Sequence, residues 1–360
     1  MTARFLGKQA AALSPYTPGE QPQDRGYIKL NTNECPFPPS PAVKIALEGI
    51  DERLRLYPDP ECGRLKNAFA AAYGVEASRV FVSNGSDETL AFAFMAFFDR
   101  GDTVCLPDLS YGFYPVYAAL CGLNAREIPL REDYSINPGD WHRAPGHILI
   151  ANPNAPTGLS LKRDDIESIL ISNPERLVMI DEAYIDFAEE GVCALPLLER
   201  HANLMVIGTL SKSRSLAGMR IGFAISSPEI IAGLDRIKYS FNPYNLSCAA
   251  QAAGEAALGD KAYLLRVTAA VKQTRERSAG ALSGMGLKVL KSGANFFMAS
   301  RPGLSGRELY LALKARGILV RCFEHPRMAQ YVRISIGTDD DMNALIAAVK
   351  EIIREGSPRQ

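Results

Sequence analysis

The sequence predicts an α/β protein with a mostly parallel sheet, joined to a smaller α+β region. From about residue 42, short apolar runs of strand length alternate with longer segments of helical periodicity. After a long helical stretch at 261–282, the pattern changes to short strands mixed with two helices. The chain of 360 residues is long enough for one large domain and one smaller domain.

The first 41 residues are rich in proline and polar side chains, as in SPYTPGEQPQ and NTNECPFPPSP. Such a composition predicts an extended arm and not a packed domain. The stretch MTARFLGKQAAAL has no apolar core of the kind that a secretory signal needs.

Residues 42–270 are expected to form the large domain. Its predicted helices are 43–50, 64–74 and 163–171, and its predicted strands are 79–83, 102–107, 147–152, 177–181 and 203–208. The strands are almost wholly apolar, which is typical of parallel strands buried on both faces. The longest apolar run, LAFAFMAFF (90–98), is too short to cross a bilayer and predicts a helix packed under the sheet.

Residues 271–360 are expected to form the small domain, which the helix at 261–282 enters. Strand-like segments at 288–300, 317–323 and 331–337 alternate there with helices at 306–317 and 342–354.

The composition excludes several classes of function. The 40 basic and 40 acidic side chains balance, so neither nucleic acid nor a membrane is expected as partner. The seven cysteines are scattered without a CxxC pair, which favours a reducing cytoplasm over a disulfide framework. The four histidines show no metal-ligand spacing, so no metal site is predicted.

The segment TLSKSRSLAGMRIGF (209–223) carries the strongest chemical signal, directly after the last strand of the large domain. The amine of Lys212 suits imine formation with an aldehyde. The hydroxyls of Thr209 and Ser211 and the guanidinium of Arg220 suit a phosphate. Pyridoxal phosphate carries both groups, so this segment predicts a site for that cofactor.

Polar and aromatic side chains also follow the other predicted strands. Ligands of open α/β sheets bind beyond the carboxyl ends of the strands, which is where these side chains are expected. Gly85, Ser86 and Asp87 form a turn and open a helix, which suits a phosphate, although helix capping alone would also explain them. Asp181 ends a buried strand, and a protonated pyridine nitrogen would balance its charge. Aromatic residues at 111–114 suit a flat ring, and the turn ANPNAPTGLS (151–160) offers amides.

The order of these motifs resembles fold-type I pyridoxal-phosphate aminotransferases of class I/II and, within them, the histidinol-phosphate aminotransferases. The resemblance covers essentially the whole chain and is carried by LNTNECPFPPSP (30–41), RLYPDP (55–60), NGSDE (84–88), NPNAPTG (152–158), DEAY (181–184), TLSKSRSLAGMRIG (209–222) and VRISIGT (332–338). It implies a mostly parallel seven-stranded sheet in the large domain, a homodimer, and transamination between histidinol phosphate and 2-oxoglutarate in histidine biosynthesis. Imidazole-acetol phosphate and glutamate would be the products.

The resemblance also implies a role for each matching residue. Lys212 would form the Schiff base and move the proton, and Asp181 and Tyr184 would bond the ring nitrogen and the phenolic oxygen. The remaining cofactor contacts would come from Gly85, Ser86, Asp87, Tyr111, Asn154, Thr209, Ser211 and Arg220, with Tyr57 donated across the dimer interface. The substrate would be held by Arg333, Arg321, Tyr16 and Asn33.

The sequence departs from the family in one place and leaves alternatives open. The family has asparagine immediately before Pro-Thr-Gly, where this chain has Ala155, so either Asn154 or Tyr184 alone would contact the ring oxygen. An aromatic amino acid aminotransferase and a phosphothreonine-type decarboxylase remain alternatives on the same fold. A pyridoxal-phosphate-binding regulator is disfavoured because no helix-turn-helix precedes the domain, and a Rossmann enzyme because no GxGxxG follows a first strand.

Overall fold

A central sheet of seven strands forms the larger part of the protein in this computed structural model, which describes residues 5–24 and 26–355. Residues 1–4 and 25 of the predicted arm and residues 356–360 of the predicted small domain lie outside the described residues. The strands follow in the order β2 (Val80–Asn84), β8 (Ile221–Ile225), β7 (Leu204–Thr209), β6 (Val178–Asp181), β5 (His147–Ala151), β3 (Thr103–Pro107), β4 (Asn124–Ile128).

The prediction of a mostly parallel seven-stranded sheet is confirmed. Strand β8 runs antiparallel to both of its neighbours, and the other neighbouring pairs are parallel. The five strands expected from apolar runs are present within about one residue of their predicted ends. Strands β4 and β8 were not predicted, because NAREI is largely polar and exposed and IGFAI overlaps the end of the lysine motif.

Successive side chains of each strand point to opposite faces of the sheet. Because these side chains are apolar, both faces of the sheet need to be covered, and helices cover them. On β2, Val80 and Val82 belong to one apolar cluster and Phe81 to the other. The first cluster includes side chains of α3 (Gly63–Tyr73), α6 (Arg163–Ser172) and α8 (Cys248–Gly259). The second includes side chains of α4 (Ser86–Phe97), α5 (Tyr114–Cys121) and α7 (Pro228–Phe241). The prediction that 90–98 is a buried helix is confirmed by α4.

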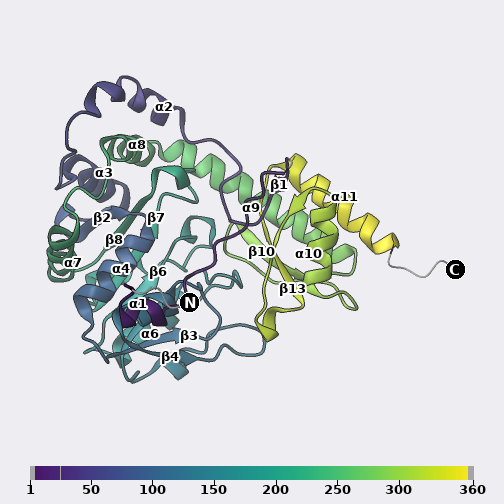
Figure 1. Cartoon of the computed structure of the whole chain (residues 1–360), viewed down its shortest axis with the longest axis horizontal. Helices are drawn as coiled ribbons and strands as arrows, with labels where there is room; N and C mark the ends of the chain where they lie inside the picture. The colour runs from purple at the N-terminus through teal and green to yellow at the C-terminus, as the bar shows by residue number, and fades with distance from the viewer. Residues whose placement is uncertain (1–4, 25, 356–360) are drawn as a thin grey trace.

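A second, smaller sheet lies beside the first, and Figure 1 shows the long helix α9 (Lys261–Gly284) running between the two. Its strands follow in the order β12 (Arg321–Cys322), β13 (Tyr331–Ser335), β10 (Phe296–Ser300), β9 (Lys288–Val289), all antiparallel. A third apolar cluster joins β10 and β13 to α9, α10 (Gly306–Ala315) and α11 (Asp339–Glu355). The predicted boundary at 270 falls inside α9, and the division into domains stays a prediction.

The N-terminal segment crosses from one sheet to the other, as Figure 1 shows. It contains the short helices α1 (Lys8–Ala12) and α2 (Pro41–Leu47), and between them β1 (Ile28–Lys29), which pairs in parallel with β11 (Ile318–Leu319). Helix α2 ends before the predicted end at 50, since the backbone of Glu48 is already extended, with ψ 130°. The crossing brings residues 31–34 into contact with side chains of both sheets. Among the described residues, no helix is long and apolar enough to cross a membrane.

Candidate active site

A cavity of about 580 Å³ lies at the carboxyl ends of the parallel strands, a volume suited to a small-molecule ligand. It is lined by residues from the large sheet, the small sheet and the N-terminal segment. Of the predicted site residues, the following line it: Tyr16, Asn33, Ser86, Asp87, Tyr111, Asp181, Tyr184, Thr209, Ser211, Lys212, Arg220, Arg321 and Arg333.

Asp181 is a buried carboxylate at the end of β6. One carboxylate oxygen accepts a hydrogen bond from the Tyr114 hydroxyl at 2.7 Å, and the other accepts from the Ala183 N–H at 3.1 Å. Burial raises the pKa of Asp181 to about 6, against the lowering effect of the Tyr114 hydrogen bond. Among the described residues no lysine, arginine or histidine forms an ion pair with Asp181. A buried acid without a cation fits a protonated pyridine nitrogen.

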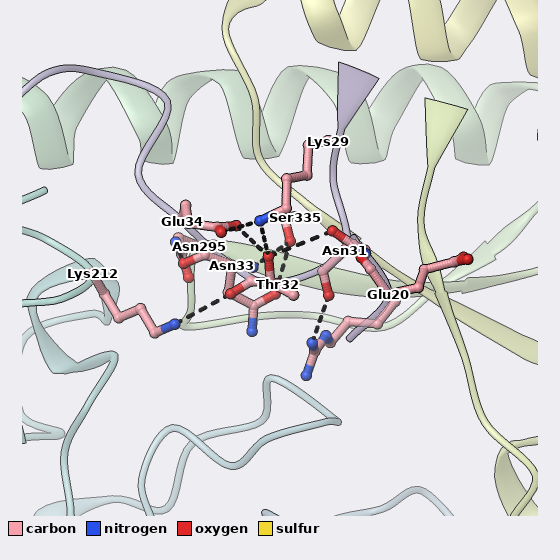
Figure 2. Close-up of polar contacts among 10 residues, drawn as sticks. Glu20, Lys29, Asn31, Thr32, Asn33, Glu34, Lys212, Asn295 and Ser335 are labelled. Carbon is pink, nitrogen blue, oxygen red and sulfur yellow. Dashed lines mark hydrogen bonds and ion pairs between the residues drawn. The ribbon is translucent and has the colours of Figure 1, made fainter. Parts of the chain in front are cut away.

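Lys212 lies just past β7, in the loop that returns to β8. Its amine donates to the carbonyl of Thr32 at 3.2 Å and lies 5.8 Å from the centre of the Tyr184 ring. Figure 2 shows the side chain pointing at the backbone of residues 31–34. The amine therefore lies in the cavity, with a carbonyl as its acceptor.

The first turn of α4 faces the loop that carries Arg220. Gly85 adopts φ 81° before this helix, and the carboxylate of Asp87 lies in the positively polarised first turn. The guanidinium of Arg220 forms an ion pair with Asp87 at 3.1 Å, and the Tyr111 hydroxyl donates to the same carboxylate at 3.1 Å. Helix N–H groups and a guanidinium thus lie on one side of the cavity, which suits a phosphate.

Close backbone packing sets this arrangement. A Cβ atom on Gly222 would overlap the backbone of Gly85 and the N–H of Ser86, so β8 can pass the start of α4 only with glycine at 222. On the neighbouring strand, the hydroxyl of Thr209 lies 2.8 Å from that of Ser211. Both hydroxyls are buried at the edge of the cavity.

Arg333 and Arg321 supply positive charge to the wall formed by the small sheet. Arg333 is on β13, where it donates to the carbonyl of Asn31 at 3.0 Å, while its Nε is buried without a hydrogen-bond partner among the described residues. Burial lowers the pKa of Arg333, and a bound anion would offset that cost. Arg321 faces it across the register of β12 and β13. A pair of guanidiniums with an unused donor fits an anionic substrate group.

Three predicted residues are not brought to the cavity wall. Gly85 contributes backbone behind Ser86. The amide of Asn154 is taken up by the loop, since it donates to Leu109 and Thr157 and accepts from Ser110.

The third is Tyr57, which is 82% exposed and stacks on Tyr244 at 4.6 Å between ring centres. Its side chain is absent from this cavity wall and lies on the surface of the chain.

Other residues at the site were not assigned a role from the sequence. The hydroxyl of Tyr114 donates to Asp181, whereas the sequence indicated only that an aromatic residue there suits a flat ring. Phe323, His325 and Met328, from the segment between β12 and β13, also line the cavity. No local pattern in FEHPRM marks these side chains, because the fold alone brings this segment to the large sheet.

Comparison with known proteins identifies the class. The family Aminotransferase class I and II matches residues 25–349, and the chain belongs to this family. Within it, the chain is similar to curated histidinol-phosphate aminotransferases. The protein of Marinomonas sp. (strain MWYL1) is 47% identical over 97% of this chain and 100% of its own length. That of Brachyspira hyodysenteriae is 48% identical over 97% of this chain and 99% of its own length.

A solved structure extends the likeness to three dimensions. The histidinol-phosphate aminotransferase of Sinorhizobium meliloti, in complex with pyridoxal-5'-phosphate, superposes with a TM-score of 0.90. The two chains are 25% identical, with 99% of each covered. The predicted fold-type I architecture is thereby confirmed, and the chain is an aminotransferase.

Proposed function

We propose that this chain transfers an amino group between histidinol phosphate and 2-oxoglutarate in histidine biosynthesis, with pyridoxal 5'-phosphate as its cofactor. One observation carries the proposal: a single cavity holds the amine of Lys212, the buried acid Asp181 and two separate groups of anion-binding side chains. The names of the relatives support the choice of substrate.

The residues present fit the cofactor at three points. Asp181 would hold the pyridine nitrogen, because it is a buried carboxylate with no cation of its own. The start of α4, with Thr209, Ser211 and Arg220, would hold the phosphate. Tyr184 lines the cavity near Lys212 and would donate to the ring oxygen. When bound, the cofactor supplies an aldehyde that joins an amine and a cationic ring that accepts electron density.

The chain's own groups would then perform the proton transfers. The amine of Lys212 is the basic group in the cavity next to Tyr184, and it would take the proton from the substrate carbon and return it. Asp181 would keep the ring cationic, since its ionised form is the better partner for a protonated nitrogen. Such general acid–base transfer is worth about 10²–10⁴ in rate.

The group of anion-binding side chains that includes Arg321 and Arg333 would serve both half-reactions. Histidinol phosphate presents a phosphate, and glutamate presents a second carboxylate. Arg321, Arg333 and Tyr16 lie at the cavity wall and would bind either group, since a guanidinium can donate two parallel hydrogen bonds to two oxygens of a carboxylate or of a phosphate. Tyr16 reaches this wall from the N-terminal segment and packs on Phe113, with 4.8 Å between ring centres.

Replacement of Arg321 tests the substrate. Arg321→Gln should raise KM for histidinol phosphate by about tenfold or more, as for a lost charge-assisted hydrogen bond, while KM for phenylalanine changes little. Arg277→Gln is the matched control, because that guanidinium pairs with Asp339 on the surface of the small-sheet region. Equal losses for both substrates would remove the argument for phosphate recognition. Turnover of phenylalanine but not histidinol phosphate would select an aromatic aminotransferase, and carbon dioxide release would select a decarboxylase.

We also propose a homodimer in which Tyr57 reaches the partner's cofactor phosphate. Leu54, Leu56, Tyr57 and Tyr244 are exposed apolar side chains, and burial in an interface would explain them. Sedimentation of the purified protein tests the assembly, and a monomer at micromolar concentration would contradict it. A cytoplasmic location is proposed as well, supported by seven free cysteines, and fractionation of cells would test it.

A further inference from the structure

Asn33 connects the N-terminal segment to both sheets. It adopts φ 58°, a left-handed conformation that is uncommon for residues other than glycine, and it is only 1% exposed. Its N–H donates to the hydroxyl of Ser335 at 2.9 Å, and its carbonyl accepts from Asn295 at 3.0 Å. Figure 2 shows these three side chains gathered beside Lys212. The backbone of Asn33 is therefore held by the small sheet on two sides.

The side chain of Asn33 continues the network toward the large sheet. Its Oδ1 accepts from the Ser335 hydroxyl at 2.8 Å, and its Nδ2 donates to the Tyr184 hydroxyl oxygen at 3.0 Å. The opposite orientation of the amide would leave the buried Ser335 hydroxyl without an acceptor, because Asn33 Oδ1 is its only acceptor among the described residues. The surroundings of Ser335 thus decide which atom of the amide faces Tyr184.

This orientation has a consequence for the phenol. A tyrosine hydroxyl has one hydrogen, and here its oxygen already accepts from Asn33. The hydrogen is therefore left for an acceptor on another side, and Tyr184 lines the cavity. Ala155 lines the same cavity and has no polar side chain, so it offers no second side-chain donor beside the phenol.

We propose that Asn33 is a positioning residue that, by donating to Tyr184, directs the phenol hydrogen into the cavity toward the ring oxygen of the cofactor. This role rests on the proposed cofactor and replaces the expected direct contact between Asn33 and substrate. It predicts a spectroscopic effect. The nitrogen that Lys212 contributes to the bound cofactor can carry a proton, and the anionic ring oxygen beside it stabilises that proton. A hydrogen bond donated to the ring oxygen weakens this stabilisation, so it favours the form in which the nitrogen carries no proton. Removing that hydrogen bond should raise the pH midpoint of the visible absorbance change of the bound cofactor by about one pH unit.

Asn33→Asp is the sharpest variant, since it replaces the donor facing Tyr184 by an acceptor of nearly the same shape. The phenol hydrogen would then turn to the new carboxylate, and the pH midpoint should rise by about one unit or more. The added charge alone would also raise the midpoint. The same substitution in a Tyr184→Phe background measures that charge effect separately, and we expect most of the rise to disappear there. A rise of the same size in both backgrounds would overturn the proposal.

Asn33→Gly removes the side chain without strain, because glycine accepts φ 58° and keeps both backbone hydrogen bonds. Its midpoint should lie clearly below that of Asn33→Asp, since no acceptor competes for the phenol hydrogen. Equal midpoints for the two variants would show that the direction of the hydrogen bond does not matter.

Neutron diffraction from the deuterated wild-type protein reads the direction itself. Deuterium on Asn33 Nδ2 between the two side chains supports the proposal, and deuterium on the Tyr184 oxygen pointing at Asn33 overturns it. The cofactor assignment is checked separately, by a visible band in the wild-type protein that borohydride bleaches. Without that band the proposed function fails. With the band present and no shift in the variants, only the role of Asn33 fails.

Discussion

Removing the hydroxyl of Tyr114 should weaken cofactor binding in a way that depends on pH. In the wild-type protein this hydroxyl donates to Asp181 at 2.7 Å, and both side chains are buried. Tyr114→Phe deletes one hydrogen bond to a carboxylate and little volume. Such a bond contributes about 1.5–3 kcal/mol, so its loss should raise the pKa of Asp181 by roughly one to two pH units above its value of about 6.

The size of the effect follows from the ionised fraction of Asp181, since the ionised carboxylate is the form that pairs with a protonated ring. At pH 6 the wild-type carboxyl is about half ionised, whereas the variant would be ionised to between about one-tenth and one-hundredth. Cofactor affinity at pH 6 should therefore fall by about 5- to 50-fold. At pH 9 both carboxyls are ionised, and the two proteins should bind almost equally.

Titration of the apoprotein with pyridoxamine 5'-phosphate measures this, because that form makes no covalent bond with Lys212. Tyr117→Phe is the matched control, since its hydroxyl lies one turn further along α5 and donates to the carbonyl of Asp87 at 2.8 Å. It should show no extra loss at low pH. A loss of affinity for Tyr114→Phe that is equal at pH 6 and pH 9 would refute the reasoning and indicate a packing effect.

Three further predictions concern other parts of the structure. Gly222→Ala should lower the free energy of unfolding by about 2 kcal/mol or more and weaken cofactor binding, because the new methyl group overlaps the backbone before α4. Gly280→Ala in α9 is the control, since its new methyl group meets nothing within 4 Å, and it should raise the free energy of unfolding by about 0.5–1 kcal/mol. Urea unfolding measures both. Burial raises the pKa of Glu182 from 4.5 to about 7, so the folded state binds this proton more tightly and stability falls as pH rises from about 4.5 to 7. Glu182→Gln should remove this pH-dependent loss of stability, so its free energy of unfolding at pH 8 should exceed that of the wild type by roughly 1–3 kcal/mol. If the free energy of unfolding of the two proteins depends on pH in the same way, the assignment to Glu182 is wrong. Lys212→Ala should abolish the borohydride-sensitive visible band while the protein still folds, and normal multiple turnover by this variant would contradict the role given to Lys212.

Local patterns predicted those parts of the fold that depend on local physics. Apolar runs marked the strands that are buried on both faces, such as β5 and β6, because burial on both sides requires apolar side chains throughout. The same rule missed β4, at the edge of the sheet, where NAREI is mostly exposed. It also missed β8, whose five buried residues IGFAI overlap the end of a motif that was interpreted for its chemistry.

The candidate site divides in a similar way. Lys212 and Asp181 were found from the sequence because they lie at or just past the carboxyl ends of parallel strands, and Arg220 was found because it belongs to the same motif as Lys212. Either Asn154 or Tyr184 alone was expected at the ring oxygen, and the structure shows that the loop uses the amide of Asn154 internally. Whether an amide faces a cavity or its own loop depends on turn geometry, which residue types alone do not specify.

The sequence alone determined the class of fold, the family and the segments that carry reactive groups, because these depend on periodicity and on motifs a few residues long. Only the tertiary structure decided which hydrogen bonds link those segments. The Tyr114 contact with Asp181 spans 67 positions, and the Ser335 contact with Asn33 spans 302. The direction of such bonds follows from the packing of distant residues that no local pattern records. Partners of this kind tune the reactive groups that the motifs supply.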